Sequence, residues 1–567
     1  MAWRFMTKRN NGNEYLYVKQ TKRTIKGEPA EEKYLGTADD IVAIVEAFKN
    51  PPAPAVIDKE FGAIAALWSI AERLNLVAIL DSVFSKRNNG PSIGTYLLVG
   101  ALSRCLEPVS KKGTPDWYDK TILPRLLGYE GKSFNSQRFW DNCHELTEEQ
   151  FFAAQKKIAR QMAEEFDLYT GSMIYDTTNY DTYIATKNPA TLAQRGRAKS
   201  KRTDLKVVGL AAMVTQDGHV PIFHQVYPGN RHDSIQFNHI LPQLSEAAEE
   251  ICHHPPDITL VLDKGNNAKE TWELWQDTPF HFVGSLPVSD YPELLEIPLI
   301  HYEELGPEDP DFKGCLAYRT TKKIFGDEYD LVVTYNPELY AGQMQGIEAN
   351  IAKCQKDFDN LCAGIMRWHR REVTRGKKPT VNGIATRVNK IISRQYMKTL
   401  WRTEITEENG LPKLDVRFDH EALRNLQNTF LGKSIIFTDR YDWSNERIVR
   451  CYRSQWQIEE MFKWSKDRER NSWKPVYHWT DPMIRMHTFC CMLGLTLTSL
   501  LLRELRRHDF LLSQRTMFDH LEAIRETQIT YPAVGRFPSR IQTLFHELNG
   551  MQQGLFQQLN LAKYCIG

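Results

Sequence analysis

The sequence predicts an α/β fold in which a mixed sheet forms the core, a β-rich and helical insertion interrupts that sheet, and a β-hairpin and a helical domain precede it. Three observations predict this arrangement. Residues 58–167 follow helical periodicity, residues 173–287 alternate short β-rich runs with helical stretches, and the composition changes sharply at Ser289. The chain of 567 residues has room for about two to four domains.

The N-terminal part predicts a hairpin followed by helices. Residues 14–36 form two alternating segments around a turn at 26–29, and the proline-rich residues 50–54 favour a domain boundary. Beyond that boundary apolar residues recur at helical spacing, and Asn135 is placed to cap a further helix. The recurring residues are Ile64, Leu67, Trp68, Ala71 and Leu74. A simple helical bundle and a helix-turn-helix both remain open for this region.

The predicted core sheet follows. Three β-rich runs come first, then a helical stretch, a strand, a second helical stretch and a last strand. This order describes a mixed sheet rather than the regular alternation of a doubly wound fold. The expected strands are 173–185, 207–215, 220–229, 258–265 and 280–287, and the expected helices are 234–253 and 268–276.

An insertion is predicted after Ser289, because residues 290–312 carry eight acidic residues, no Lys or Arg and several prolines. Strand-like and helical runs follow, until a strong helix begins with Ser444 as its N-cap. The expected strands are 315–324, 328–335, 413–419 and 433–439, and the expected long helix is 337–371. The helices that close the core therefore lie C-terminal to the insertion.

The charge balance is nearly neutral over the whole chain but uneven along it. Seventy-two Lys and Arg oppose seventy-one Asp and Glu, which taken alone argues against a basic nucleic-acid-binding protein. Residues 367–402, however, hold eleven Lys or Arg and one Glu, and residues 187–206 hold seven against a single Asp. Such segments are often solvated helix faces, but this excess of cations favours DNA contact, with Trp368, Tyr396 and Trp401 available to stack on bases. The candidate DNA-binding residues here are Arg370, Arg371, Arg375, Lys377 and Lys378.

Several function classes are excluded. The ten cysteines form no Cys-x-x-Cys pair, which argues against zinc ribbons and haem attachment and indicates reduced thiols in a cytosol. The start of the chain has no apolar signal-peptide core, and the apolar residues 488–502 are shorter than the roughly 20 that a membrane span needs. We therefore expect a buried core helix there, and a cytoplasmic protein without a membrane partner. Gln427 replaces the first glycine of a phosphate-binding loop, so no nucleotide cofactor is expected.

Two aspartates stand at strand positions where chemistry is common. Asp176 lies inside an apolar β-type run, and Asp263 ends another run just before a Gly turn. Functional groups gather at the carboxyl ends of strands in open α/β sheets, and a buried carboxylate needs a cation or metal. A hydrogen-bonded aspartate that merely ends a strand is the alternative for each, and Asp181 is a rival for the first position.

A third carboxylate lies on the helix expected over residues 444–467. At 100° per residue, Tyr452, Gln455, Glu459 and Lys466 fall on one face, which Phe462 extends. A partly buried ion pair within a packing helix is the alternative. Together, the three carboxylates suggest a site for two Mg²⁺ ions, because hard cations prefer oxygen ligands and a metal pair can drive phosphodiester chemistry.

These motifs resemble the DDE transposases of bacterial and archaeal insertion sequences, in the superfamily with a Y-x2-R-x3-E-x6-K signature. Tyr452, Gln455, Glu459 and Lys466 keep its spacing, with Gln in place of Arg and Arg453 close by. The Asp176-Thr177-Thr178 run is similar to the family's first motif and selects Asp176 over Asp181. The Asp263-Lys264-Gly265 turn is similar to the second, and Gly229, Asn230 and Asp233 resemble a recurring family turn.

The resemblance implies an RNase H-like core and a metal-dependent enzyme. Asp176, Asp263 and Glu459 would hold two Mg²⁺, for which Mn²⁺ can substitute, while Tyr452, Lys466, Gln455 and Arg453 would contact DNA. The activity implied is endonuclease cleavage at terminal inverted repeats of double-stranded DNA, followed by strand transfer into target DNA. It also implies cut-and-paste transposition by a homodimer in a prokaryotic, nucleoid-associated setting. A nuclease without strand transfer and an inactive, transposase-derived DNA-binding protein are the alternatives.

The expected domains follow from these assignments. They are a β-hairpin arm over 1–50, a helical domain that binds DNA ends over 58–167, the first part of the core over 168–288, the insertion over 289–440, and the second part of the core with C-terminal helices over 441–567.

Overall fold

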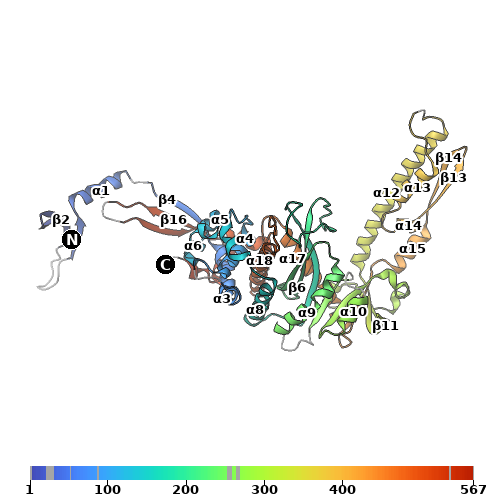
Figure 1. Cartoon of the computed structure of the whole chain (residues 1–567), viewed down its shortest axis with the longest axis horizontal. Coiled ribbons are helices and arrows are strands. Elements are labelled where there is room, and N and C mark those ends of the chain that lie inside the picture. Colours follow the sequence, from blue (N-terminus) through green and yellow to red (C-terminus); the bar gives the residue numbers. More distant parts are fainter. Residues whose placement is uncertain are drawn as a thin grey trace.

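The computed structural model describes residues 3–20, 31–50, 53–85, 89–251, 258–263, 269–373, 375–474, 476–534 and 538–565. The molecule is elongated, with a central body that contains the main sheet and two arms that leave it at opposite ends (Figure 1). One arm holds the N-terminal strands and the first helix, and the other holds a long helix of the insertion.

The main sheet has nine strands in the order β10-β11-β12-β15-β9-β8-β5-β6-β7. β5, β6 and β7 form an antiparallel meander, while β8 pairs parallel to β5 and β9 pairs parallel to β8. This is the RNase H-like arrangement, so the predicted fold class is confirmed. The strands are β5 Ser172–Thr182, β6 Lys206–Thr215, β7 Pro221–Pro228, β8 Thr259–Leu262, β9 His281–Leu286, β10 Glu303–Glu304, β11 Leu316–Ile324, β12 Asp327–Tyr335 and β15 Lys433–Thr438.

Helices cover both faces of this sheet, which explains why its central strands are apolar nearly throughout. On one face, Trp272 of α10 packs against Phe282 of β9 with ring centroids 4.6 Å apart. On the other, α17 contacts β5, and α18 contacts β7. The core helices are α9 Asp233–Ile251, α10 Lys269–Trp275, α16 Asn445–Arg453, α17 Trp456–Lys466 and α18 Asp481–Arg507.

Helix α18 contains the apolar stretch of residues 488–502. It is long and apolar enough to cross a membrane, but 94% of its most apolar window is buried inside the protein. Its close packing on α4 confirms that it is a core helix.

The expected single helix over 444–467 is wrong, because the chain breaks it at Ser454 and Gln455 into α16 and α17. The Ser454 hydroxyl donates to the carbonyl of Cys451 (2.6 Å), and the Gln455 amide bonds three residues back, to Tyr452 (3.3 Å). A serine hydroxyl that bonds back to its own helix competes with the backbone and favours such a bend. Ser444 caps α16 as expected, through the amide of Arg447.

The helical region packs on α18 as one body with the core. Ile64 and Leu67 of α2 are fully buried, and Asn135 caps α7 by accepting from the amide of Arg138 (3.0 Å), so both sequence expectations are confirmed. The helices are α2 Gly62–Arg73, α3 Leu76–Asp81, α4 Ile93–Leu106, α5 Thr114–Lys120, α6 Leu123–Leu127, α7 Ser136–Cys143 and α8 Glu148–Phe166; α19 Gln514–Glu522 and α20 Gly550–Gln558 pack beside them.

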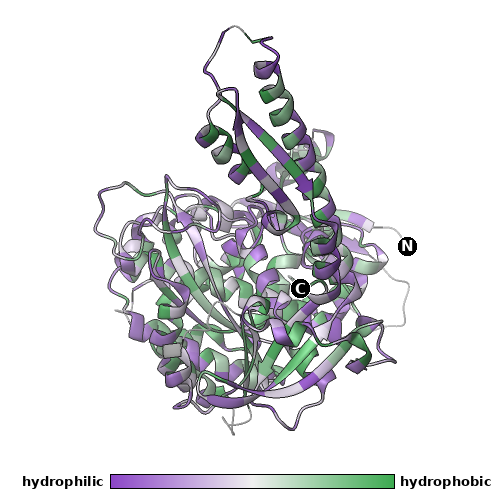
Figure 2. Ribbon diagram, turned by 90° about the vertical axis from the view of Figure 1, so that its right-hand side faces the viewer, coloured by the Kyte–Doolittle hydropathy of each residue, from purple (hydrophilic) through white to green (hydrophobic). Residues whose placement is uncertain are grey.

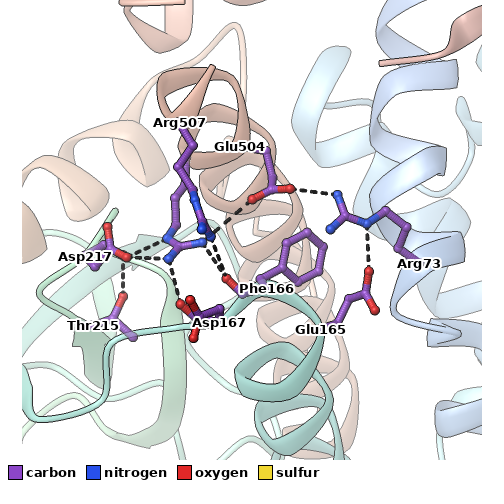
Figure 3. A network of polar contacts seen from close by, with 9 residues as sticks. Arg73, Glu165, Phe166, Asp167, Thr215, Asp217, Glu504 and Arg507 are labelled. Carbon is purple, nitrogen blue, oxygen red and sulfur yellow. Dashed lines mark hydrogen bonds and ion pairs between the residues drawn. The ribbon is translucent and has the colours of Figure 1, made fainter. Parts of the chain in front are cut away.

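A polar network ties this region to the core (Figure 3). The buried guanidinium of Arg503 on α18 donates to the Asp217 carboxylate (2.7 Å) in the β6–β7 turn and to the carbonyls of Phe166 (2.7 Å) and Asp167 (2.9 Å). Arg73 of α2 bridges to Glu504 of the same helix (2.9 Å). The network therefore anchors α2, the end of α8 and the β6–β7 turn of the sheet to helix α18.

The N-terminal arm contains more β structure than expected. β2 and β3 pair antiparallel as the hairpin prediction requires, although its turn at 26–29 lies outside the described residues. β1 adds a third strand, and β4 joins a separate sheet with β16 and β17 from the C-terminal part. Glu526 of β16 is fully buried and pairs with Arg125 through two bonds of 2.7 and 2.9 Å. The elements are β1 Trp3–Asn10, β2 Asn13–Gln20, β3 Glu31–Gly36, α1 Ala38–Lys49, β4 Ala55–Glu60, β16 Arg525–Tyr531 and β17 Arg540–Phe545.

The insertion supplies outer strands of the main sheet and then leaves it as the second arm, which stands clear of the body (Figure 2). It has a small core of its own, in which Trp401 is 4% exposed and packs against Phe358 and Phe418. The expectation that Trp401 stacks on bases is therefore wrong, because the ring is needed inside this core. The elements are α11 Pro292–Leu295, α12 Pro337–His369, α13 Val381–Ile391, α14 Met397–Leu400, β13 Trp401–Glu408, β14 Leu411–Phe418 and α15 His420–Thr429.

Candidate active site

Two candidate carboxylates come from neighbouring parallel strands, Asp176 from within β5 and Asp263 from just beyond the end of β8. β5 and β8 pair in parallel with Met173 opposite Leu260 and Ile174 opposite Val261. Continuing this register by two residues sets Asp176 opposite Asp263, and parallel neighbours are about 4.8 Å apart. Both aspartates are half-buried.

The electrostatics of Asp176 agree with that placement. Burial raises the pKa of its carboxyl to about 6, the Lys199 ammonium works against this rise, and the Asp263 and Asp233 carboxylates add to it. The amide of Thr177 also donates to Asp176 (2.7 Å) and favours the charged form. Carboxylates crowded together in a partly dry site favour a proton or a cation between them.

Asp181, the rival to Asp176, has a different setting. Side chains alternate along a strand, so Asp176 and Asp181 point to opposite faces of β5. Asp181 is 8% exposed and accepts a hydrogen bond from Ser200 (2.8 Å). The Asp181 carboxylate therefore has a hydrogen-bond partner on the face of β5 opposite to Asp176.

Tyr452 connects the strand carboxylates to Glu459. Burial raises the pKa of the Tyr452 phenol, a hydrogen bond with Ser285 of β9 lowers it, and the charges of Asp263 and Glu459 both raise it. Tyr452 therefore lies near Asp263 and Glu459 at once, although α16 carries the phenol and α17 carries the glutamate. The break between these helices replaces the continuous face that the spacing predicts.

Lys466 reaches β5 from the end of α17. Its ammonium donates to the Thr178 hydroxyl (2.7 Å) and lies over the Tyr180 ring at 5.7 Å from the centroid. Thr178 and Tyr180 share a strand face with Asp176. The chain thus sets a lysine two positions along the strand from the first carboxylate.

Gln455 and Arg453, the two residues that could take the place of the signature arginine, differ in their hydrogen-bond partners. Gln455 sits at the helix break, and its Nε2 is buried with no hydrogen-bond partner in the part of the chain that the structure describes. Arg453 instead donates to the carbonyl of Asp311 (2.9 Å) and lies over the Phe312 ring (4.8 Å). Arg453 is therefore engaged with the start of the insertion.

Sequence reasoning did not single out Lys199 as part of the site. Its ammonium donates to the carbonyl of Thr177, and its amide donates to Asn179 Oδ1 (2.9 Å), which fixes the β5–β6 loop beside Asp176. The only sequence signal was the basic segment that contains it. Asp233, at the start of α9, accepts from Tyr227 (3.0 Å) and influences Asp176 from the other side.

A basic cavity of about 590 Å³ opens beside these residues. Its wall combines the β5–β6 loop with the turn after β7, and its cations are Arg195, Arg197, Lys199, Lys201 and Arg231. The basic segment that the sequence predicts as DNA-contacting therefore lines a concave surface next to Asp176.

The donor chemistry of the site fits hard divalent cations. Asp176, Asp263 and Glu459 supply oxygen atoms only, and a cation would favour the charged form of Asp176 that burial disfavours. Within the described ranges, no three Asp, Glu, His or Cys side chains are already close enough to hold a metal ion. The residues directly after Asp263, 264–268, lie outside those ranges.

The basic residues of 367–402 lie far from these carboxylates. α12 has 33 residues and spans about 50 Å, so its end at His369 is at the tip of the arm. Arg370, Arg371, Arg375, Lys377 and Lys378 follow this end and are all exposed. They form a separate surface, the arm tip.

Comparison with known families identifies the chain. The sequence matches the family described as the transposase DDE domain over residues 182–475. The protein belongs to this transposase family. The match contains Asp263, Glu459 and Lys466 and begins just after Asp176.

The chain is also similar to two solved transposase complexes. A piggyBac transposase synaptic complex with hairpin DNA aligns over 83% of this chain and 82% of that chain, with a TM-score of 0.35 and 8% identity. A Mos1 transposase paired-end complex aligns over 37% of this chain and 63% of that chain, with a TM-score of 0.14 and 15% identity. No curated protein sequence gives a match.

Proposed function

We propose that this transposase cleaves double-stranded DNA at terminal inverted repeats and joins the freed 3′-hydroxyl to target DNA, by a cut-and-paste route. The observation that supports the proposal is the parallel pairing of β5 with β8, whose continued register sets Asp176 opposite Asp263, together with the influence of both Asp263 and Glu459 on the Tyr452 phenol. Family membership supports the DNA-processing class of this activity.

Asp176, Asp263 and Glu459 would hold two Mg²⁺ ions, or Mn²⁺ in their place. When bound, these ions activate the attacking oxygen and stabilise the leaving oxygen of a phosphodiester. The chain's own residues position the DNA. Lys466 and Lys199 present ammonium groups beside Asp176, bonded to Thr178 and Thr177, where they would bind phosphates and orient the scissile strand.

Tyr452 and Gln455 complete this surface in the proposal. The phenol of Tyr452 is influenced by the charges of both Asp263 and Glu459 and can donate to a phosphate oxygen. The unpartnered amide of Gln455 provides a neutral donor where the family signature has a charged one.

The other parts of the chain would extend the contact along DNA. The helical domain of residues 58–167 would bind the transposon end, and the exposed arm tip would bind phosphates about 50 Å from the sheet edge. Such a distance suits DNA bound to a second copy, so a homodimer that pairs two transposon ends is part of the proposal. Its setting would be the nucleoid of a prokaryotic cytoplasm.

The test uses the DNA that flanks the gene. Purified protein with Mg²⁺ should nick labelled duplexes at the ends of terminal inverted repeats and join them to a supercoiled target. Asp176→Asn, Asp263→Asn and Glu459→Gln should each abolish cleavage while DNA binding persists, whereas the matched control Asp181→Asn should still cleave. Full cleavage by any of the three variants would overturn the site. Cleavage without joining by the wild type would favour a nuclease.

A further inference from the structure

A second cationic and aromatic pocket lies outside the carboxylate site. Its volume is about 260 Å³, and it lies between the helical domain and the segment that leads into α18. Arg104, Lys111 and Lys112 come from α4 and the α4–α5 loop, Trp140 comes from α7, and Tyr477 and Trp479 come from the C-terminal segment.

Two of its cations lack a counter-ion. Arg104 is 2% exposed and donates to the carbonyls of Lys474 (3.2 Å) and Val109, while its Nε has no partner among the described residues. The Lys111 ammonium lies over the Phe139 ring, 4.3 Å from the centroid. Across the described ranges, neither cation forms an ion pair with a carboxylate. Buried cations without an anion are costly, so this pocket is ready for an anion.

A glycine on α4 leaves space for the Lys111 ammonium. Gly100 on α4 faces it, and a Cβ at that position would lie 3.2 Å from the lysine Nζ. The two histidines of the pocket do not compete for an anion's charge, because burial lowers the pKa of His478 to about 3 and also lowers that of His487. Burial also lowers the pKa values of Lys111 and Arg104, so an anion bound in the pocket would favour the charged forms of these two side chains.

An aromatic ladder borders the same pocket. Trp479 stacks on Trp140 (6.2 Å, 18°), and Trp140 stacks on His144 (5.6 Å, 9°). Trp479 and Tyr477 are 55% and 59% exposed, which is unusual for such large rings. Flat exposed rings beside unpaired cations match a nucleotide, whose phosphate is anionic and whose base has a π face.

The pocket is connected to the carboxylate site. The amide of Tyr183, just past the end of β5, donates to the carbonyl of Val476 (3.0 Å), and Tyr180 of β5 stacks on Trp473 (4.0 Å, 6°). The segment with Tyr477 and Trp479 therefore runs past the end of the strand that carries Asp176. Seven residues of extended chain from Asp176 to Tyr183 span about 23 Å, a distance that bound DNA can bridge.

We propose that this pocket captures a single unpaired nucleotide of the bound DNA, with its phosphate on Lys111 and Arg104 and its base stacked on Trp479. The inference deepens the proposed DNA function and rests on it. The pocket would be a second DNA-binding site besides the carboxylate site. The protein should therefore bind DNA with an unpaired, phosphorylated end more tightly than DNA without one.

The test measures binding without cleavage. A fluorescein-labelled single-stranded oligothymidylate, with or without a 5′-phosphate, is titrated with the full chain in EDTA and followed by anisotropy. The wild type should prefer the phosphorylated strand. Trp479→Ala should weaken binding of both strands at least about fivefold, with partial rescue by Trp479→Phe, and Lys111→Gln should erase the preference. Lys120→Gln on α5 and the exposed Leu511→Ala are the matched controls and should bind as the wild type does.

The outcomes separate this inference from the proposed function. If the wild type shows no preference and Trp479→Ala binds normally, the pocket is overturned, even when cleavage at inverted repeats is intact. If Trp479→Ala and Lys111→Gln bind as expected while the wild type fails to cleave, the proposed transposase activity is wrong and the nucleotide pocket is supported.

Discussion

Asp176 of β5 and Asp263, one residue beyond the end of β8, lie opposite each other when the parallel register of these two strands is continued. The pairing of Ile174 with Val261 fixes this relationship two residues earlier. Burial raises the pKa of Asp176, and the nearby Asp263 and Asp233 carboxylates raise it further. The fold thus stores an electrostatic cost that a bound cation would remove.

The first prediction concerns that cost in the metal-free protein. The pKa of Asp176 is about 6 when folded, against an ordinary 3.8, so folding disfavours its charged form. The penalty is present in full above about pH 6 and vanishes below about pH 4. Asp176→Asn should therefore raise the free energy of unfolding by about 1–3 kcal/mol at neutral pH and by much less near pH 4.

Urea denaturation of EDTA-treated protein at both pH values measures this difference. Asp181→Asn is the control, and it should not stabilise the protein because it disturbs the bond from Ser200. A neutral-pH stability of Asp176→Asn at or below that of the wild type would contradict the electrostatic account.

The second prediction concerns Lys466. Its bond to Thr178 holds the ammonium on the face of β5 that carries Asp176. Lys466→Gln should lower the cleavage rate by about 10²-fold or more, as expected when a preorganised group that stabilises transition-state charge is lost. Lys463→Gln, an exposed lysine on the same helix, should stay near the wild-type rate in the same single-turnover assay. Equal losses in both variants would point to a general effect on α17.

The third prediction concerns the arm tip. If Lys377 and Lys378 contact phosphates, their double substitution by Gln should lower the slope of log affinity against log salt by about two units. The control is the doublet Lys353 and Lys356, which is exposed nearer the base of α12. Anisotropy titrations at several salt concentrations give both slopes, and identical slopes for the two doublets would remove the arm tip from the DNA interface.

The fourth prediction concerns the anchoring of the helical region. Arg503 is 6% exposed and bonds to Asp217 and to two carbonyls at the end of α8. Arg503→Met should lower the free energy of unfolding by about 2–4 kcal/mol, because it leaves these acceptors without their donor. The exposed pair of Arg202 and Asp204 is the comparison, and Arg202→Gln should have little effect on the denaturation midpoint. A loss equally small for Arg503→Met would show that the network is dispensable.

Local patterns predicted much of the fold, because apolar periodicity reports which faces are buried. The strands around Asp176 and Asp263, the stripe of α2 and the cap at Asn135 all follow from such patterns. The pairing of β4 with β16 does not, since it joins residues about 470 positions apart in sequence, and no local signal encodes the partner. The spacing does not predict the break at Ser454 because helical spacing continues across it, and the bond from the Ser454 hydroxyl back to Cys451 has no signature in the spacing.

The candidate site residues that lie in regular secondary structure were predictable from the sequence. Helical spacing singled out Tyr452, Glu459 and Lys466, the end of a strand singled out Asp263, and an apolar strand with a carboxylate inside it singled out Asp176. Lys199 could not be singled out, because its place beside Asp176 depends on how the β5–β6 loop folds back through Asn179. The prediction that Trp401 stacks on bases was wrong because the sequence of a basic segment does not show whether its tryptophan faces DNA or packs inside a small core.

The last prediction separates Gln455 from Arg453. Both lie near the signature position, but Arg453 is committed to the Asp311 carbonyl and the Phe312 ring, whereas the Gln455 amide is buried and unpartnered among the described residues. Gln455→Leu should therefore weaken binding of a cleavable DNA end several-fold, as the loss of a hydrogen-bond donor to a charged group does. Arg453→Gln should leave that affinity nearly unchanged and instead make residues 309–315 more sensitive to protease. Should the affinity fall with Arg453→Gln and hold with Gln455→Leu, the arginine would be the phosphate contact, and its bond to the insertion would have to break when DNA binds.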